Sequence, residues 1–510
     1  MKTSHTLLAI IFIYFSFSAA KAQDTIILTY EQAVDIALKK SYTILSHDES
    51  RQASQYDYLY YKAQFKPRLD FNVSTPSWDE GLRGVDQVND LPVYNSYSSM
   101  QFGGDLRFTY VLPTGGNLAL SGTMYHETYK TSFLNELGDY ETLKRKQAYS
   151  KFGIIFNQPI FTKNTLRENL KAAEYRYQQT EAYFTRAQMD IVYDVTVAFY
   201  RLYQADYERK INEERVRNST EALRIARLKQ ETGNIPEGDV LITEINVAQN
   251  NARLSESVGL YETEKDAFKL LIGLELKHDV DIIAKTDFEP TAIDLEIAID
   301  QALQNRMEIK ENEYDIKLQN IQVDKAKRER EFKGNVLAYY DLTGLGTDGS
   351  GVGDRFQSSF DDLTVRPPNR GITLTLSYPI YDWGRGRNIV KREKIRLKAE
   401  ELKLENTKRT IEKEIREVVR TVYEAENRFR INQKNIESAS RSYKINQLRF
   451  ENGDITGQEL ALEQERLSQV QLDYISSYIT YQLALADLKR KTMWDFENNR
   501  SYKIDNDLEK

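Results

Sequence analysis

Two long stretches of the chain carry hydrophobic residues at the spacing of an α-helix. Residues 162–232 and 387–452 contain neither glycine nor proline, and Ala, Leu, Glu, Lys, Arg and Gln dominate both. The apolar stripes consist of Ile191, Val195, Ala198, Phe199 and Leu202 in the first stretch, and of Ile411, Ile415, Val418, Val419 and Val422 in the second. At 1.5 Å per residue, each stretch predicts a helix of roughly 100 Å. Such helices must pack side by side with others to bury their stripes.

Shorter helical patterns flank the long ones, and the chain repeats this plan. The shorter patterns cover about 31–65, 239–272, 296–332 and 458–496. At one constant offset, Ala33, Asp35, Ala37, Leu38 and Ile44 match Ala298, Asp300, Ala302, Leu303 and Ile309. We therefore predict two structural repeats, 23–290 and 291–496, followed by a polar C-terminal tail at 497–510. Each repeat reads as helices, strands, a long helix, a tight turn and a final helix.

Between the helices the pattern changes to the alternation of apolar and polar residues that is typical of strands. Ile372, Leu374 and Leu376 alternate with threonines and a serine. The predicted strands cover about 66–75 and 151–161 in the first repeat, and about 335–343 and 371–381 in the second. A further hairpin is predicted at 103–125, and the sequence leaves open whether it joins the other strands. Strands of this kind fit both a buried sandwich and a membrane barrel.

Two segments rich in Gly, Ser, Asp and Asn, 76–100 and 344–370, are predicted to be long loops. Loops of that length suit the outer face of a membrane barrel, so they favour the barrel over the sandwich.

The first residues have the pattern of an export signal. Lys2 and His5 precede an apolar run from Leu7 to Phe17, and the pair Ala20 and Ala22 fits cleavage before Gln23. We therefore predict a signal peptide at 1–22. The alternative is a transmembrane anchor, but the apolar run is shorter than the roughly 20 residues that a spanning helix needs.

Composition removes several classes of protein. The 510 residues include no cysteine and only four dispersed histidines, so we predict no disulfide framework, no metal site and no lipid anchor on cysteine. No set of nucleophile and base is visible, and we predict neither catalytic residues nor a cofactor. The net charge of −7 comes from 70 basic and 77 acidic residues that are mixed along the chain, which argues against a nucleic-acid partner. A mean hydropathy of −0.60 indicates a chain bathed mostly in water.

Taken in order, these features resemble the TolC-type outer-membrane efflux protein family. The resemblance runs from Leu28-Thr29-Tyr30-Glu31-Gln32-Ala33, through the strand ends 157–161 and 377–381 and the turns 233–239 and 453–459, to Leu485-Ala486-Asp487-Leu488. It implies a fold that is mainly α with membrane β. Two duplicated halves would form a homotrimer with an outer-membrane β-barrel continued by a periplasmic α-helical barrel. Each chain would supply four strands to a barrel of about twelve.

The same resemblance implies a function. The protein would be the passive outer-membrane channel of a tripartite efflux or type I secretion system, with a large periplasmic portion and no enzymatic activity. Its implied partners are two further copies of itself, a periplasmic adaptor protein, an inner-membrane transporter reached through that adaptor, and outer-membrane lipid. The alternative hypothesis is an exported coiled-coil structural protein of the cell envelope, which would need no detergent for solubility.

The turns 233–239 and 453–459 are the predicted functional sites. Glycine suits the left-handed residue that ends a helix, and an acid suits the first turn of the next one, so these residues also fit simple helix caps. The resemblance implies that the turns form the periplasmic entrance and contact the adaptor. The predicted site residues are Gly233, Asn234, Asp239, Gly453, Asp454 and Glu459.

This sequence departs from the family pattern at the second turn. The family's basic residue falls on Ile455, and a further acidic position falls on Leu462. If Asp239 and Glu459 nevertheless line the lumen in three copies, the crowded negative charge would raise their pKa values and favour cations.

Pro159 and Pro379 are predicted to be structural residues at the strand-to-helix junctions, because a proline has no N–H for the strand ladder.

Overall fold

The computed structural model describes residues 26–87, 90–134, 139–284 and 290–502. The predicted signal peptide, 1–22, and residues 503–510 of the predicted tail lie outside the described residues.

The chain divides into two compact units, and both collect segments that lie far apart in the sequence. The helical unit combines residues 1–51, 180–311 and 403–510, and the strand unit combines residues 52–179 and 312–402. Each unit takes segments from both predicted repeats, because the unit boundaries fall inside helices instead of between the repeats.

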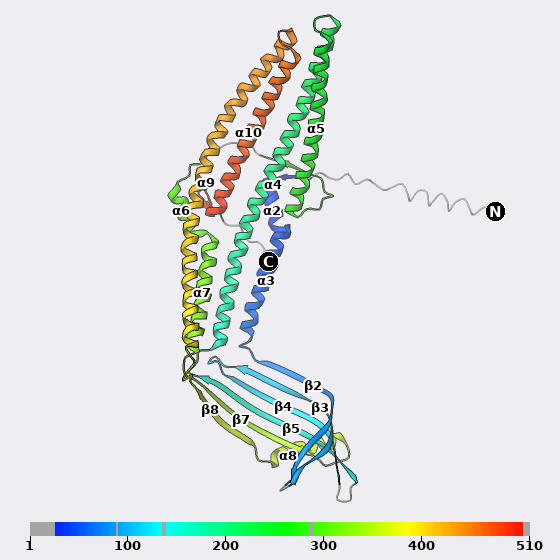
Figure 1. The fold of residues 1–510 in the computed structure, drawn as a ribbon, viewed down its shortest axis with the longest axis vertical. Coiled ribbons are helices and arrows are strands. Elements are labelled where there is room, and N and C mark those ends of the chain that lie inside the picture. Colours follow the sequence, from blue (N-terminus) through cyan, green and yellow to red (C-terminus); the bar gives the residue numbers. More distant parts are fainter. Residues whose placement is uncertain (1–25, 88–89, 135–138, 285–289, 503–510) are drawn as a thin grey trace, which may run out of the picture. The chain divides into compact units, whose positions relative to one another are not determined.

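Eight of the described helices form pairs of matching length, one from each repeat (Figure 1). The pairs are α2 (Tyr30–Lys40) with α6 (Leu295–Asn305), α3 (Tyr42–Ala63) with α7 (Met307–Arg328), α4 (Thr165–Glu231) with α9 (Arg385–Asn452), and α5 (Glu237–Ile272) with α10 (Gly457–Thr492). The two longest have 67 and 68 residues. This pairing confirms the predicted duplication. None of the described helices combines the length and the apolar character needed to cross a membrane.

The shorter helical patterns near 31–65 and 296–332 were each expected as one helix, and this expectation is wrong. Each is broken at a single residue with extended backbone, Ser41 (φ −61°, ψ 130°) and Arg306 (φ −62°, ψ 130°). Arg306 is fixed in place by Glu308 and Glu414, whose carboxylates lie 2.7 and 2.5 Å from its guanidinium.

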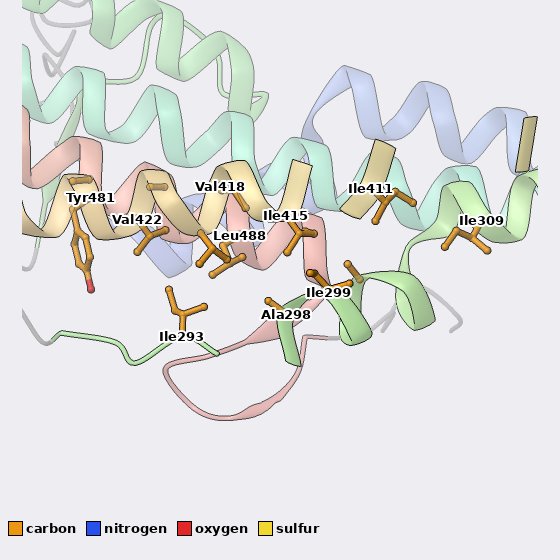
Figure 2. Close-up of a cluster of buried hydrophobic side chains, with 14 residues drawn as sticks. Ile293, Ala298, Ile299, Ile309, Ile411, Ile415, Val418, Val422, Tyr481 and Leu488 are labelled. Atoms are coloured by element: carbon orange, nitrogen blue, oxygen red, sulfur yellow. The ribbon is translucent and has the colours of Figure 1, made fainter. Parts of the chain in front are cut away.

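The apolar stripe of α9 forms a core with α6 and α10 inside the helical unit (Figure 2). Ile411, Ile415, Val418 and Val422 point from one side of α9 towards Ala298 and its neighbours. All of the predicted stripe residues of α9 are buried. A second core lies around Phe199, Leu202 and Phe268, with the predicted stripe residues Ile191 and Val195 of α4. Burial of these stripes stabilises helices that would be marginal alone.

Short strands complete the helical unit. β1 (Ile26–Thr29) pairs in parallel with β6 (Val280–Ile283), and β9 (Trp494–Asp495) pairs with β10 (Arg500–Ser501). The second pair corrects the predicted tail. Residues 497–502 are folded back onto the end of α10, because Asp495 accepts hydrogen bonds from the backbone of Glu497 and Asn498, both at 3.1 Å.

The strand unit holds one antiparallel sheet, here called the long sheet, with six strands among the described residues. Its strands, in spatial order, are β2 (Arg68–Gln87), β3 (Asp90–Val111), β4 (Asn117–Leu134), β5 (Tyr140–Ile160), β7 (Lys333–Gly346) and β8 (Asn369–Ser377). We call the end of the sheet that carries Arg68 and Ile160 proximal, because α3 and α4 adjoin it along the chain. The opposite end is distal.

The long sheet corrects the strand predictions. The hairpin at 103–125 lies inside the sheet, between β2 and β5, so the described chain supplies six strands where the resemblance implied four. The predicted loop at 76–100 is mostly strand, because Trp78 and Leu82 continue the alternation beyond a bulge after Ser74. Cross-strand pairing stabilises this segment despite its two glycines and four serines.

The predicted loop at 344–370 contains a helix, α8 (Val352–Val365). Its Ser359 hydroxyl donates to the Gly344 carbonyl at 3.2 Å, and its Asp362 carboxylate accepts from the Leu345 N–H at 2.8 Å. A side chain at Gly344 would collide with the Ser359 carbonyl. The glycines that suggested a loop therefore permit a helix to pack closely on β7.

Candidate functional site

The two turns predicted as functional sites lie at the same end of the helical unit, at the tips of the hairpins α4–α5 and α9–α10 (Figure 1). Gly233 and Gly453 have left-handed backbone, with φ of 75° and 89°. The N–H of Asn234 donates to the Lys229 carbonyl at 2.8 Å, and the N–H of Asp454 donates to the Arg449 carbonyl at 2.9 Å. Both long helices therefore end in the same Schellman motif, which satisfies carbonyls that the helix leaves free.

The helices that follow the turns begin differently. In α10, Thr456 and Glu459 form a capping box, in which the Glu459 carboxylate accepts from the Thr456 N–H at 2.8 Å and the Glu459 N–H donates to the Thr456 hydroxyl at 3.3 Å. In α5 the N-cap is Pro236, without a side-chain cap hydrogen bond, and Asp239 lies in the first turn. Glu459 is therefore the N3 partner of a capping box, whereas Asp239 is an acidic first-turn residue whose charge favours the helix N-terminus.

The cap changes the acidity of Glu459. Hydrogen bonds from the Thr456 backbone and hydroxyl hold the pKa of this exposed carboxyl below its usual value. A single chain thus favours the ionised form of Glu459, which is the opposite of the upward shift expected from crowding in a lumen.

A small apolar cluster joins the two tips. Val240 and Leu460, which are equivalent in the two repeats, are buried with Phe450, and Ile235 and Ile455 pack against them. Ile455, where the resemblance implied a basic residue, therefore makes a packing contact between the hairpins. Leu462, where it implied an acidic one, is 64% exposed.

Polar links that the sequence did not predict also tie the hairpins together. The ammonium of Lys229 donates to the Phe450 carbonyl and lies 4.7 Å from the centre of the Phe450 ring. Glu465 of α10 accepts from Arg215 of α4 and, at 2.5 Å, from Arg253 of α5. Burial alone would raise the pKa of Glu465, but the two guanidinium groups hold it below its usual value. Only Lys229 could have been noticed from the sequence, because a basic residue in the last turn of a helix often binds free carbonyl groups.

The predicted proline junctions differ from each other in the structure. Pro159 is the penultimate residue of β5 and pairs with Asn335, beyond the end of the β4 ladder at Asn157. Pro379 follows β8, which ends at Ser377, so the predicted strand 371–381 is too long at this end. Left-handed backbone follows each proline, at Phe161 (φ 61°) and at Trp383 (φ 54°), where the chain turns from strand to helix.

The long sheet has one apolar and one polar face. The pairing register places on one face a set of large apolar side chains that are all exposed: Leu69, Phe71, Val73, Leu106, Leu120, Phe152, Ile154, Ile372 and Leu374. The other face carries Asp70, Asn72, Asp105, Arg107, Thr123, Lys151, Asp341, Thr343 and Thr373. Ile372 is 81% exposed, whereas Lys151 and Asp341 form an ion pair at 2.8 Å on the polar face. An exposed apolar surface of this size marks a site of contact with lipid or protein.

The sheet also has two open edges. In the described chain, β2 pairs only with β3, and β8 pairs only with β7. Open edges present unpaired backbone N–H and C=O groups, and within hydrocarbon each such group costs several kcal/mol. The sheet therefore needs a partner strand at both edges if its apolar face meets lipid.

Among the described residues, no three His, Cys, Asp or Glu side chains are grouped so as to hold a metal ion. The main features of the described chain are therefore surfaces that can contact other molecules. They are the two joined helix tips of the helical unit and the amphipathic sheet of the strand unit.

Comparison with known proteins gives a family and a fold. The model of a family described as outer membrane efflux protein matches residues 33–274 and 298–491, one segment in each repeat. No curated protein matches the sequence closely enough to count as a relative.

Several solved structures are similar to this chain. The Campylobacter jejuni CmeC outer membrane channel is 15% identical, with a TM-score of 0.65 and coverage of 93% of this chain and 87% of that one. The outer membrane protein VceC from Vibrio cholerae is 14% identical, with a TM-score of 0.60 and coverage of 90% and 95%. The open state of the Neisseria gonorrhoeae MtrE outer membrane channel is 13% identical, with a TM-score of 0.60 and coverage of 93% and 91%. At these identities the similarity shows the fold alone, and it confirms the predicted class of duplicated long helices with a strand-rich part.

Proposed function

Because the chain belongs to the outer membrane efflux protein family, we propose that it is the outer-membrane channel of a tripartite efflux or type I secretion system. Members of this family are channels of the outer membrane with a large periplasmic portion, and they are not enzymes. The tripartite efflux or type I secretion system is the part of this function that goes beyond membership of the family. A passive tube has no energy source of its own, so an inner-membrane transporter would drive the substrate through it.

The amphipathic long sheet is the observation that carries the proposal. Its apolar face is exposed in the single chain, whereas its polar face carries charged residues such as Arg107 and Lys151. A membrane barrel needs this arrangement, with apolar side chains towards lipid and polar side chains towards a water-filled lumen. A soluble scaffold would have to cover the apolar face with another layer of protein.

The open edges of β2 and β8 support a closed homotrimer. Pairing of β8 in one copy with β2 in the next satisfies both edges, and a three-fold axis closes the ring. Three copies of the six described strands would make eighteen, instead of the twelve that the resemblance implied. Lipid of the outer membrane would then surround the joined apolar faces.

The tips are proposed as the periplasmic entrance and as the contact with the adaptor protein. Gly233 and Asn234 are exposed in one turn, with Asp239 half-buried beside them, and Gly453, Asp454 and Glu459 are exposed in the other. The ties through Lys229, Phe450 and Glu465 hold the two turns of one chain together. The entrance would therefore widen by movement of whole chains relative to one another.

Crosslinking in cells tests the adaptor contact. Since the chain has no cysteine, a single cysteine at Asp239 or Glu459 can carry a crosslinker to whatever lies beside the tip. We expect capture of a periplasmic adaptor, and with it an inner-membrane transporter. The matched control is Tyr140→Cys at the distal end of the long sheet, which should capture neither. Equal capture from Tyr140 would contradict the proposed orientation.

Conductance of the reconstituted channel tests the role of the acids. If they line the constriction, Asp239→Asn together with Glu459→Gln should lower the preference for cations. Conductance and ion selectivity that stay the same would remove the acids from the constriction and leave them as first-turn residues of α5 and α10.

A further inference from the structure

Three lysines lie on the apolar face of the long sheet, at its distal end. Lys130 of β4 pairs directly with Lys144 of β5, and Lys146 lies two residues further along β5 on the same face. All three side chains are exposed. The intervening Arg145 points to the polar face, because side chains alternate along a strand. We call Lys130, Lys144 and Lys146 the distal lysines.

The pairing of Lys130 with Lys144 is unfavourable by itself. Residues directly opposite each other in an antiparallel pair have Cβ atoms roughly 5 Å apart, and like charges at that distance repel. No carboxylate offsets this repulsion across the neighbouring pairs: Lys146 lies opposite Thr128, and on the β3 side Lys130 lies opposite Ser98. The nearest acid in this row is Glu80 of β2, which lies opposite Ser98 and is therefore two strands away from Lys130. A bound anion would remove the repulsion.

A buried arginine adds positive charge to the same face. Arg355 of α8 is only 7% exposed, and its guanidinium lies 3.4 Å from the His126 ring and donates to the Ser350 carbonyl at 3.2 Å. Both of these partners are uncharged acceptors. His126 pairs with Ala148, two residues from Lys146 on the same face, so α8 places this cation beside the distal lysines.

Apolar side chains lie beside the cations, level with Lys146 and on its proximal side. Phe102 stacks on His126 with ring centres 5.2 Å apart, and Trp78 and Met100 form a pair on the same face. Trp78 and Met100 are exposed, and the apolar face continues from them towards the proximal end. Aromatic side chains beside cations, near the distal end of an apolar surface, match the boundary between acyl chains and anionic headgroups.

We propose that the distal lysines, together with Arg355, bind the phosphate-bearing headgroup of a lipid in the outer leaflet of the membrane. The acyl chains of that lipid lie along the apolar face near Trp78 and Phe102. This site rests on the outer-membrane location and on contact of the apolar face with lipid. It depends neither on the trimer nor on the adaptor.

The test uses the full-length protein purified in a neutral detergent and two forms of one glycolipid, lipid A with its phosphates and lipid A without them. Native mass spectrometry counts the bound lipid, and thermal unfolding measures the stabilisation that it gives. Lys144→Gln should weaken binding of the phosphorylated form about fivefold, and the triple change of the distal lysines to glutamine about a hundredfold. Arg145→Gln is the matched control, since it removes one charge from the neighbouring residue on the other face.

Two results would overturn the proposal: equal binding of both lipid forms, or equal weakening by Lys144→Gln and Arg145→Gln. Inorganic phosphate is the third arm. If phosphate alone stabilises the protein as much as the phosphorylated lipid, the site binds free anions and not a lipid headgroup. Recovery of each variant in the outer-membrane fraction is measured separately, so a failure of membrane location is distinguishable from a failure of the lipid site.

Discussion

At the scale of the residue, the shape of each tip depends on one glycine. Gly233 and Gly453 are the residues at which the long helices stop, and both have positive φ. Glycine adopts this backbone without a steric penalty, whereas other residues are strained there. Gly238, five residues after Gly233, has no positive φ and lies in the first turn of α5.

This contrast predicts opposite effects of the same substitution. Gly233→Ala should destabilise the tip by about 1 kcal/mol, because alanine is strained in left-handed backbone. Gly238→Ala should be neutral or stabilising by up to about 1 kcal/mol, because alanine favours the helix. Hydrogen exchange of the segment 228–245 measures both. Equal effects of the two changes would contradict the assignment of Gly233 as the helix-ending residue.

Glu459 gives the cap of α10 a dependence on pH. Its pKa is lowered in the folded chain by the hydrogen bonds from Thr456, so its stabilising effect is complete above the unfolded pKa, near 4.3. The effect is lost as the pH falls through the folded pKa. Protection of the first turn of α10 in the wild type, relative to Glu459→Gln, should therefore shrink as the pH falls below about 4.

The matched control for this measurement is Asp239→Asn, at the equivalent position of α5. Its helix has Pro236 as N-cap and no side-chain cap hydrogen bond. We expect the difference in hydrogen-exchange protection between the wild type and Asp239→Asn to be smaller than that between the wild type and Glu459→Gln. A difference for Glu459→Gln that stays constant from neutral pH to pH values below about 4 would exclude the capping box as the source of the protection.

At the scale of the element, the long sheet separates two kinds of environment along one strand. In β8, Ile372 points to the apolar face and Thr373 to the polar face. Lysine at the lipid face of a membrane barrel costs about 2 to 4 kcal/mol near the middle of the bilayer. Ile372→Lys should therefore lower recovery of folded protein in the outer-membrane fraction, whereas Thr373→Lys should leave it unchanged. Equal losses, or no loss from either, would contradict the lipid-facing assignment.

The open edges of the sheet predict a specific contact between copies. Asn72→Cys in β2 and Thr373→Cys in β8 place one cysteine near each edge on the polar face, in a chain that has no other cysteine. Mild oxidation should give covalent dimers and trimers, with neighbouring positions tested in turn to find the register. Thr123→Cys in β4, combined with Thr373→Cys, should give none, because β4 is an inner strand.

The sequence predicted the helices better than the strands, for physical reasons. Long helices need only an uninterrupted pattern, and the absence of Gly and Pro from 162–232 was sufficient. The breaks at Ser41 and Arg306 have no such local signal: Ser41 is buried in the folded chain, and Arg306 is paired with Glu414 of α9, 108 residues away. In β2 and β3, glycine and serine concealed an alternation that becomes visible only when the partner strands are aligned.

The candidate sites also differ in how far the sequence predicts them, according to whether they depend on local or on long-range contacts. The two tips were predictable from Gly233, Gly453 and the acids that follow them, because helix ends have local sequence signatures. The ties between the tips were not, because Lys229 and Phe450 are 221 residues apart in the chain. The distal lysines required the register of β4 with β5, since only the pairing shows that Lys130 and Lys144 face each other.

At the scale of the whole molecule, the duplicated chain supplies two kinds of surface that remain open in one copy. The strand unit has an apolar face and two strand edges, and the helical unit has two exposed tips. Neither kind is complete in a monomer. The family membership and these open surfaces together favour an assembly that spans the outer membrane and extends into the periplasm.

The most direct test of this account is a map from electron cryomicroscopy of the full-length protein in lipid nanodiscs. The account predicts three copies around a three-fold axis, with β8 of each paired to β2 of the next in a closed ring of eighteen strands. A continuous lumen should run through it, with lipid against Ile372 and Phe71. A monomer, or a trimer whose sheets remain open or whose apolar faces turn inwards, would contradict the central claim that the chain forms an outer-membrane channel.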